Sequence, residues 1–309
     1  MAQKNRRRWL CILPLIAASL LMALAGCHKS GASAVTKAGR RPRRIVSTVP
    51  AATQILLQIG AGHAIAAVSS YDEPLLHGQY RKLPVIGNYL RLNTELMIDL
   101  HPTALVLQIQ PSLIPQSIRH LTQKLRCRII DIRLNSIADL AQTTRELGAA
   151  AGCSTSAALA VARLARGVKH AQHAFAVHPP VTVVYCISAN PLRIVGGDNF
   201  MNDEVQLAGG QNLGNTLGAG FPRISHGQLL ELNPEKILIW HPGKVFHGPY
   251  RWLQAHFPGR LCRIPWPDAD LLTLGVVRKI RRIHQMLNPQ PKMADTQTTP
   301  AHLPARRLP

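Results

Sequence analysis

Short apolar runs alternate with amphipathic stretches along most of the chain. Several of these runs are rich in β-branched residues and have the length of buried strands: residues 44–49, 64–68, 104–107, 128–132, 181–186, 236–240 and 261–264. Helical periodicity falls between them, for example at residues 51–59, which end at Gly60, and at residues 113–124. Strands that alternate with helices in this way predict parallel α/β layers.

One long helix is predicted in the middle of the chain. It starts from Ser154, a good N-cap, and apolar side chains recur at helical spacing before the next proline, Pro179: Val161, Leu164, Ala165, Val168 and Phe175. A helix of about 20 residues spans about 30 Å, which is enough to bridge two small domains. We therefore expect an α/β fold of two lobes with parallel sheets, at residues 43–152 and 178–289, joined by a backbone helix at residues 153–177.

The first 27 residues predict export. Three arginines at positions 6–8 precede an apolar run at residues 9–25, and small residues then lead to Cys27. This combination is typical of a bacterial lipoprotein signal, with the lipid carried on Cys27. A single transmembrane anchor is the alternative, because the run is just short of the roughly 20 apolar residues that a spanning helix needs. The expected location is the periplasm or cell envelope, lipid-anchored to a membrane.

Two further segments contain few apolar side chains that a folded core could bury. Residues 28–42 are mostly small or basic and predict a flexible linker. Residues 290–309 are rich in Pro, Thr and Arg without periodicity and predict a disordered tail.

The chain is strongly basic, with 36 Lys and Arg against 15 Asp and Glu and a formal net charge of +21. Cleavage of the signal removes four of these cations and leaves +17. Such a charge favours anionic partners, such as lipid head groups or acidic ligands. Nucleic acid is not an expected partner of an exported protein, and we expect a monomer. The alternative is that few carboxylates suit an acidic exterior.

Cysteines leave two possibilities open. Cys127, Cys153, Cys186 and Cys262 would lie in a compartment that permits disulfides, and four cysteines allow three connectivities. Buried free thiols are the alternative. Since no two of them form a Cys-x-x-Cys pair, the sequence does not favour a zinc or redox site.

Candidate ligand-binding residues follow the predicted strands. Ligands of parallel α/β sheets bind beyond the carboxyl ends of the strands. In the first lobe this rule selects Tyr71 and Tyr89, with Gln110 and Arg133 as weaker candidates. In the second lobe it selects Asn190, Arg193, His241, Trp266 and Asp268. Phe221 also lies in a loop, and the set predicts an aromatic and polar cleft.

Several stretches, in order, resemble a known family. They are RIVSTVPAATQIL at 44–56, VSSYD at 68–72, LPVIGNY at 83–89, residues 93–95 leading to 100–102, VGGDN at 195–199, AGGQN at 208–212 and NPEKIL at 233–238. Together they resemble the substrate-binding proteins of ABC importers for cobalamin, ferric siderophores and haem. The resemblance implies a class III periplasmic binding protein fold, in which one rigid backbone helix joins two α/β lobes.

The resemblance also implies a function. Such proteins hold a cargo between the lobes and deliver it to an ABC permease and its ATPase, without catalysis and without a cofactor. The expected cargo is a cobalt or iron chelate, namely cobalamin or a ferric siderophore. Docking to the permease typically uses one glutamate on each lobe. Glu95 matches the first position, but Gly227 stands at the second, so Glu231 is the candidate substitute.

Three alternatives remain at this point. A haem receptor is one, because Tyr89 and His241 are able to ligate iron and arginines could meet propionates. A receptor for bare zinc or manganese is another, although the histidines are scattered. An exported hydrolase is the third, although the chain lacks a Gly-x-Ser-x-Gly elbow.

Overall fold

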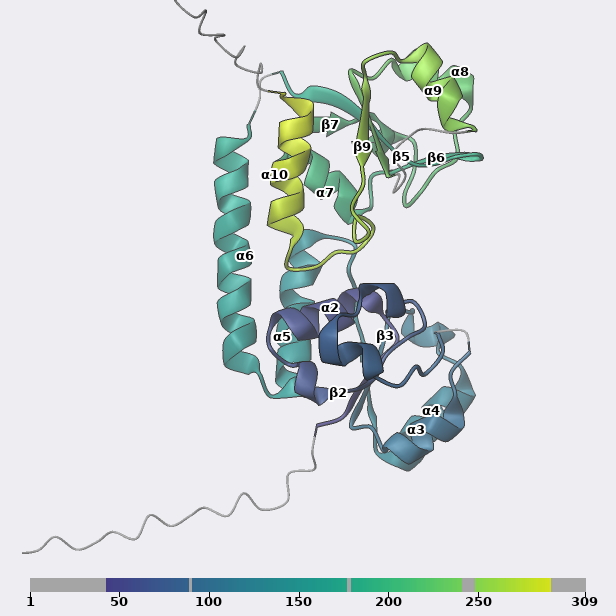
Figure 1. The fold of residues 1–309 in the computed structure, drawn as a ribbon, viewed down its shortest axis with the longest axis vertical. Coiled ribbons are helices and arrows are strands. Elements are labelled where there is room, and N and C mark those ends of the chain that lie inside the picture. The colour runs from purple at the N-terminus through teal and green to yellow at the C-terminus, as the bar shows by residue number, and fades with distance from the viewer. Residues whose placement is uncertain (1–42, 89–90, 177–178, 241–247, 290–309) are drawn as a thin grey trace, which may run out of the picture. The chain divides into compact units, whose positions relative to one another are not determined.

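The computed structural model describes residues 43–88, 91–176, 179–240 and 248–289 (Figure 1). The predicted signal with its lipidation site Cys27, the linker at residues 28–42 and the tail at residues 290–309 lie outside this part of the chain. Across the described ranges, none of the helices combines the length and the apolar content that crossing a bilayer requires.

A four-stranded parallel sheet forms from the first half of the described chain, in the order β2-β1-β3-β4. Its strands are β1 (Ile45–Ser47), β2 (Ile65–Ala67), β3 (Ala104–Leu107) and β4 (Arg128–Asp131). The central strands β1 and β3 are buried along their whole length, as parallel strands covered by helices must be. This sheet and four helices form the unit that we call the N-lobe. The helices are α2 (Pro50–Gln58), α3 (Thr94–Leu100), α4 (Gln116–Leu125) and α5 (Ile137–Ala151).

A five-stranded sheet forms from the second half. Its strands are β5 (Val181–Ala189), β6 (Leu192–Ile194), β7 (Gly210–Asn212), β8 (Lys236–Trp240) and β9 (Leu261–Ile264). β5 pairs in parallel with β7 and β8, and β8 with β9, whereas β6 runs antiparallel to β5 because Asn190 and Pro191 turn the chain straight back. This sheet and four further helices form the C-lobe. The helices are α7 (Phe200–Leu207), α8 (His226–Leu232), α9 (Tyr250–His256) and α10 (Val276–Leu287).

The long helix α6 (Ser154–Ala174) confirms the predicted backbone helix and packs against α5, α7 and α10 (Figure 1). The expected N-cap was wrong by one residue. Ala157 donates its N–H to the Cys153 carbonyl at 2.9 Å, so Cys153 is the N-cap and Ser154 is the first helical residue. The turn is this tight because Gly152 adopts a φ of 74° directly after α5.

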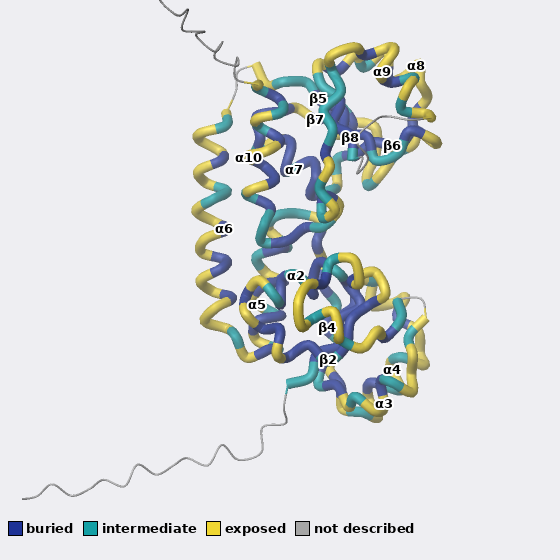
Figure 2. Tube along the Cα trace, in the orientation of Figure 1, coloured by how far each residue is buried: buried dark blue, intermediate teal, exposed yellow. Residues whose placement is uncertain are grey.

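Small residues bring α6 close to its neighbours. Figure 2 shows buried and exposed positions alternating along α6. The buried face includes Ala157, Ala160 and Ala171, whereas Ala165, expected on that face, is exposed. A Cβ at Gly148 of α5 would overlap with the Cβ of Ala157, so the methyl group of Ala157 packs directly against the α5 backbone at this glycine. The apolar pattern alone favours large side chains on the packed face, but close helix approach requires small ones.

Both lobes share one hydrophobic core cluster, to which α2, α5, α6, α7 and α10 all contribute. Two hydrogen bonds between backbone and side chain also join the lobes. The Leu274 N–H donates to Oε1 of Gln58 at 3.0 Å, and the Ile137 N–H donates to Oδ2 of Asp203 at 3.0 Å. The described body is therefore held together by packing along α6 and by polar contacts at the junction of the lobes.

Candidate functional site

A polar pocket of about 550 Å³ lies at the carboxyl ends of β3 and β4 in the N-lobe. Asp131 organises it, because its Oδ1 accepts the Ile109 N–H at 3.2 Å and so fixes the loop after β3. Gln110 and Arg133, the two weaker sequence candidates, both line this pocket. The sheet topology brings them together, since β3 and β4 are adjacent parallel strands whose ends meet at one edge.

A second pocket, of about 340 Å³, adjoins the first and shares Asp131 and Arg133 with it. Its other lining residues come from α5 and include the carboxylates of Asp139 and Glu146. The Arg133 carbonyl accepts the hydroxyl of Thr143 at 2.9 Å, which ties the strand end to this helix. One arginine among several carboxylates and amides gives a surface that can both donate and accept hydrogen bonds to a polar ligand.

The loop after β2 presents Tyr71 to solvent with half of its surface exposed, at 50%. Beneath it, the buried carboxylate of Asp72 accepts the N–H of Ser69 at 2.9 Å and its hydroxyl at 2.8 Å. Burial raises the pKa of Asp72, and the hydrogen bonds from Ser69 oppose that rise. Tyr71 is therefore carried by a turn with a fixed, buried anchor.

In the C-lobe, three candidates gather around β6. Asn190 is exposed at the turn between β5 and β6, and its bond to Pro191 is cis. Arg193 on β6 forms an isolated antiparallel bridge with Arg223, two residues beyond Phe221. Phe221 is 41% exposed, which is unusual for a large apolar ring. This edge of the lobe thus combines an exposed ring with two arginines.

Trp266 follows β9, as expected, but several of its contacts are with other parts of the fold. The Trp266 carbonyl accepts the indole N–H of Trp240 at 3.1 Å. The guanidinium of Arg282, on α10, lies 5.2 Å from the centre of the Trp266 ring, a cation–π contact. Trp266 is half-buried and packs against the shared core. Asp268, two residues further on, is half-buried, and its carbonyl accepts the amino group of Lys279.

The docking candidates lie at exposed helix positions. Glu95 occupies the first turn of α3, which Asn93 caps by accepting the Leu96 N–H at 3.0 Å. Glu231 is exposed on α8. Gly227 lies in the first turn of that helix, where a Cβ would make only an ordinary contact, 3.7 Å from Oγ of Ser225. Beside it, the ring of His226 stacks on Trp252 of α9, with centroids 3.8 Å apart.

Two site candidates, Tyr89 and His241, lie outside the described residues. Among the described residues, no group of three or more His, Cys, Asp or Glu side chains could hold a metal ion. The cysteine alternatives are resolved by the structure, in which all four described cysteines are free thiols: Cys127, Cys153, Cys186 and Cys262. Burial raises the pKa of both Cys127 and Cys186 to about 12, so these thiols remain protonated.

Sequence reasoning missed a buried charge cluster beneath the loop that follows β9. Glu204 on α7 and Lys279 on α10 are both buried, and Lys279 donates to the carbonyls of Asp268 and Leu271. Burial raises the pKa of Glu204 to about 8, although Lys279 opposes the rise. Oε1 of Glu204 has no hydrogen-bond partner in the described part of the chain. The detectable signal was Lys279, a cation on the apolar face of α10 beside Val276, Ile280 and Ile283.

Comparison with known proteins agrees with this architecture. A family model described as "Periplasmic binding protein" matches residues 45–246. Among curated relatives, the Vitamin B12-binding protein of Vibrio vulnificus is 24% identical over 253 residues, which cover 79% of this chain and 88% of that protein. The Vitamin B12-binding protein of Pectobacterium atrosepticum is 22% identical over 218 residues, 69% of this chain and 77% of that protein.

Solved structures are similar in fold. The periplasmic Heme binding protein HutB of Vibrio cholerae superposes with a TM-score of 0.70 at 18% identity, covering 81% of this chain and 100% of that one. The periplasmic Vitamin B12 binding protein BtuF of Vibrio cholerae superposes with a TM-score of 0.65 at 19% identity, covering 79% and 96%. The predicted architecture of two lobes and one backbone helix is therefore confirmed.

Proposed function

Because the chain belongs to the periplasmic binding protein family, we propose that it is the substrate-binding component of an ABC importer. It captures a metal chelate between its lobes in the periplasm or cell envelope and delivers it to a permease driven by an ATPase. It acts by binding and release and carries out no covalent chemistry on the cargo.

The observation that carries the proposal is the pair of exposed aromatic rings, Tyr71 and Phe221, one on each lobe. Exposed aromatic side chains in loops suit a large planar ligand, because ring contacts supply binding energy with little loss of side-chain freedom. Arg133 and Gln110 in the N-lobe pocket and Arg193 in the C-lobe supply donors for polar groups at the ligand's edge. Asn190 and Trp266 complete the proposed cleft on the C-lobe.

We propose cobalamin as the cargo. The curated relatives described above are vitamin B12-binding proteins, and a corrin ring with amide side chains suits aromatic contacts surrounded by neutral and cationic donors. Ferric siderophores resemble cobalamin in being bulky ligands that hold a chelated metal. Haem is the second candidate, because a protein with this fold and a TM-score of 0.70 binds haem.

Titration of the purified protein with cobalamin, haem and ferric siderophores tests the proposal. Trp240, the last residue of β8, and Trp266, just after β9, are linked by a hydrogen bond and provide a fluorescence signal close to the C-lobe side of the proposed cleft. Binding of one chelate at low micromolar concentration or tighter is expected. If none of these ligands binds, the proposal is wrong.

One substitution separates cobalamin from haem. Tyr89→Phe removes a phenol oxygen able to ligate iron but keeps the ring. Haem binding, followed through its absorption spectrum, should then be lost if haem is the cargo, whereas cobalamin binding should persist. Leu159→Ala serves as the control, because Leu159 is an exposed apolar side chain on α6, 58% accessible, outside the proposed cleft.

We also propose that lipid on Cys27 and the linker at residues 28–42 hold this receptor at a membrane, and that Glu95 and Glu231 dock to the permease. Glu95 and Glu231 are exposed on separate lobes, as two docking points require. Mass spectrometry of the native protein tests the lipid: a Cys27→Ser variant should lose both the added mass and the membrane association.

A further inference from the structure

The backbone helix α6 and the last helix α10 contain no carboxylate. The chain has 15 Asp and Glu, yet none lies between Glu146 and Asp198, and none lies between Asp270 and Asp295. The two helices fall within these intervals and together contain seven Arg and Lys. Part of the excess positive charge of the chain is therefore gathered on α6 and α10.

The two helices lie side by side and run in the same direction (Figure 1). A Cβ at Gly167 of α6 would lie 2.7 Å from Cγ2 of Val277 on α10. Further along both helices, the ring of Phe175, directly after α6, stacks on His284 of α10 with centroids 4.3 Å apart. α6 and α10 therefore form one layer of the molecule.

Exposed basic side chains lie where the two helices meet. On α6, Arg163 and His170 are four residues before and three residues after Gly167, so they flank the contact with α10. On α10, Arg281 lies between the two residues that contact α6. We call five exposed side chains the basic face: Arg163, Arg166 and His170 on α6, and Arg278 and Arg281 on α10.

One exposed leucine extends this face. Leu159 is 58% exposed and lies one turn before Arg163, whose Nε donates to the Leu159 carbonyl at 3.4 Å. Leu159, Arg163, Arg166 and His170 follow one another at intervals of three or four residues, so they share the side of α6 that faces away from the core. Cations around an apolar side chain suit a partner surface that is anionic with an apolar layer beneath it.

We propose that the basic face binds the surface of an anionic phospholipid bilayer. This inference rests on the proposed location of the protein in the periplasm or cell envelope. Each Lys or Arg held at an anionic bilayer strengthens binding by about fivefold. The basic face is spread along two helices, and none of its residues lines either polar pocket, so an extended anionic surface suits it better than a single small anion.

The basic face acts together with the lipid that we propose on Cys27. A basic patch alone holds a protein at a membrane only reversibly, whereas stable anchoring needs a second signal such as a lipid chain. The face therefore sets the orientation of a protein that the lipid retains. The proposed docking helices α3, with Glu95, and α8, with Glu231, lie on the other side of the body from α6 (Figure 1). Both docking positions thus stay exposed when the basic face lies on the bilayer.

Equilibrium binding to vesicles tests the basic face. The protein used is the chain from His28 onward, which lacks the signal and the lipid; it retains all hydrophobic clusters of the described chain, which span residues 45–287. It should bind vesicles of equal parts phosphatidylglycerol and phosphatidylcholine but not vesicles of phosphatidylcholine alone. Binding should be lost between about 0.1 M and 1 M salt, because the screening length falls from about 10 Å to 3 Å. Equal binding to both kinds of vesicle, or binding to neither, would overturn the proposal.

A pair of charge reversals locates the binding surface. Arg166→Glu together with Arg281→Glu should lower the affinity for the mixed vesicles at least about twentyfold, because two attractive charges become repulsive. Lys124→Glu together with Arg251→Glu is the matched control, with the same change in net charge at exposed positions of α4 and α9. The control should stay within about twofold of the parent, since distant charges are screened. Equal losses in both pairs would assign the binding to net charge and exclude the basic face.

Two further measurements separate this proposal from others. Arg166→Glu with Arg281→Glu should keep the parent's cargo affinity, so loss of the receptor function and loss of vesicle binding are distinguishable. A duplex oligonucleotide should not displace the protein from the mixed vesicles. Displacement by the duplex at an equal concentration of phosphate would assign the basic face to nucleic acid instead. Circular dichroism checks that every variant is folded.

Discussion

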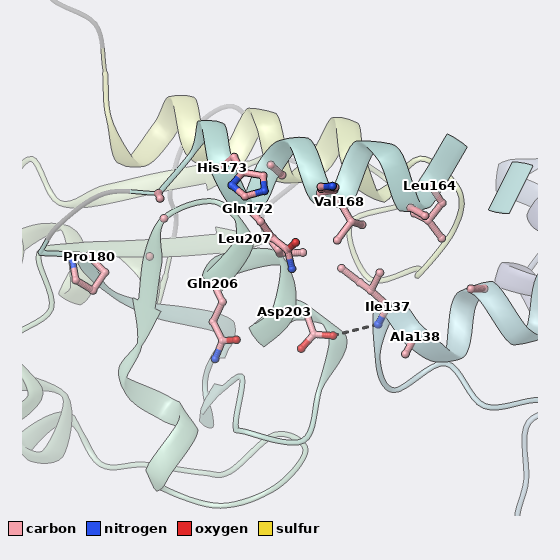
Figure 3. Close-up of a pocket in the computed structure, with 17 residues that line it drawn as sticks. Ile137, Ala138, Leu164, Val168, Gln172, His173, Pro180, Asp203, Gln206 and Leu207 are labelled. Carbon is pink, nitrogen blue, oxygen red and sulfur yellow. Dashed lines mark hydrogen bonds between the residues drawn. The ribbon is translucent and has the colours of Figure 1, made fainter. Parts of the chain in front are cut away.

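The carboxylate of Asp203 on α7 accepts the backbone N–H of Ile137, the first residue of α5, at 3.0 Å (Figure 3). This hydrogen bond joins the C-lobe to the N-lobe at a helix start, where an N–H has no partner within its own helix. Asp203 thus connects the two halves of the protein, as Gln58 does through the Leu274 N–H. Burial raises the pKa of Asp203, because removal from water makes the ionised carboxylate less favourable.

Asp203→Ala should lower the free energy of unfolding by about 1 kcal/mol, because the Ile137 N–H loses its acceptor. Asp203→Asn keeps an acceptor without the charge and should retain the parent's stability. Urea denaturation measures both, with Asp198→Ala, at an exposed position nearby in sequence, as the control. Equal losses for the Ala and Asn variants would show that the hydrogen bond is not the source of the stability.

Gly148→Ala should destabilise the protein by about 1–3 kcal/mol, because the new methyl group overlaps with Ala157 and forces α5 and α6 apart. The same substitution at Gly227, where the new methyl group would be at ordinary contact distance, 3.7 Å from Oγ of Ser225, should instead stabilise by up to about 1 kcal/mol through helix propensity. Thermal denaturation of the two variants decides between packing and propensity: a stabilised Gly148→Ala would contradict the close approach of the helices.

Glu204 should make stability depend on pH. Its pKa in the folded protein is about 8, against an ordinary value of 4.5, so between these values the folded state holds a proton that the unfolded state has released. The free energy of unfolding should therefore fall as pH rises from about 4.5 to about 8. Glu204→Gln, neutral throughout, should flatten this slope and be more stable than the parent above pH 8.

Urea midpoints measured across this pH range provide the check. Glu73→Gln is the control, since Glu73 is exposed and its removal should leave the slope unchanged. A Glu204→Gln variant with the parent's slope would assign the pH dependence to other groups.

Asp72→Ala should weaken cargo binding without removing any cargo contact. The carboxylate of Asp72 anchors the Ser69 turn, and its loss should free the loop that carries Tyr71. We expect a loss of affinity of about tenfold, similar to that of Tyr71→Ala, because a mobile ring must be ordered on binding. Isothermal titration with the identified cargo measures both variants. Unchanged affinity in Tyr71→Ala would remove Tyr71 from the cleft.

Glu95→Ala should reduce cargo uptake while leaving cargo affinity unchanged, because Glu95 is exposed on α3 and is proposed to meet the permease rather than the cargo. Stimulation of the transporter's ATPase by the cargo-loaded protein gives the readout. Asp99→Ala, an exposed carboxylate on the same helix, is the matched control. Equal stimulation by Glu95→Ala and the parent would exclude Glu95 from docking.

Most secondary structure could be predicted from the sequence. The strands at residues 104–107, 236–240 and 261–264 have the predicted bounds, because short apolar runs between polar turns are too short for buried helices. The helix expected at residues 113–124 instead begins at Gln116, since Pro111 and Pro115 divide its start into a 3-10 turn and an extended residue before the helix. Proline position was visible in the sequence, but the competing turn was not.

The candidate site was only partly predictable. Gln110 and Arg133 share a pocket because β3 and β4 are adjacent in the sheet. The order of strands in a sheet cannot be predicted from the local sequence pattern of each strand. Trp266 followed the strand-end rule, yet Arg282, 16 residues later in the chain, covers one side of its ring. The role of each loop residue therefore depended on which distant element packed against it.

By itself, the sequence determined the α/β class, the backbone helix, the basic charge and the resemblance to importer receptors, because these follow from local periodicity, composition and ordered motifs. Tertiary structure decided which residues face one another. It placed Glu204 beside Lys279, Asp203 against Ile137, and Gln110 in one pocket with Arg133. Such contacts join segments far apart in the chain, and only packing of the two lobes along α6 selects them from the many pairings that the same residues allow.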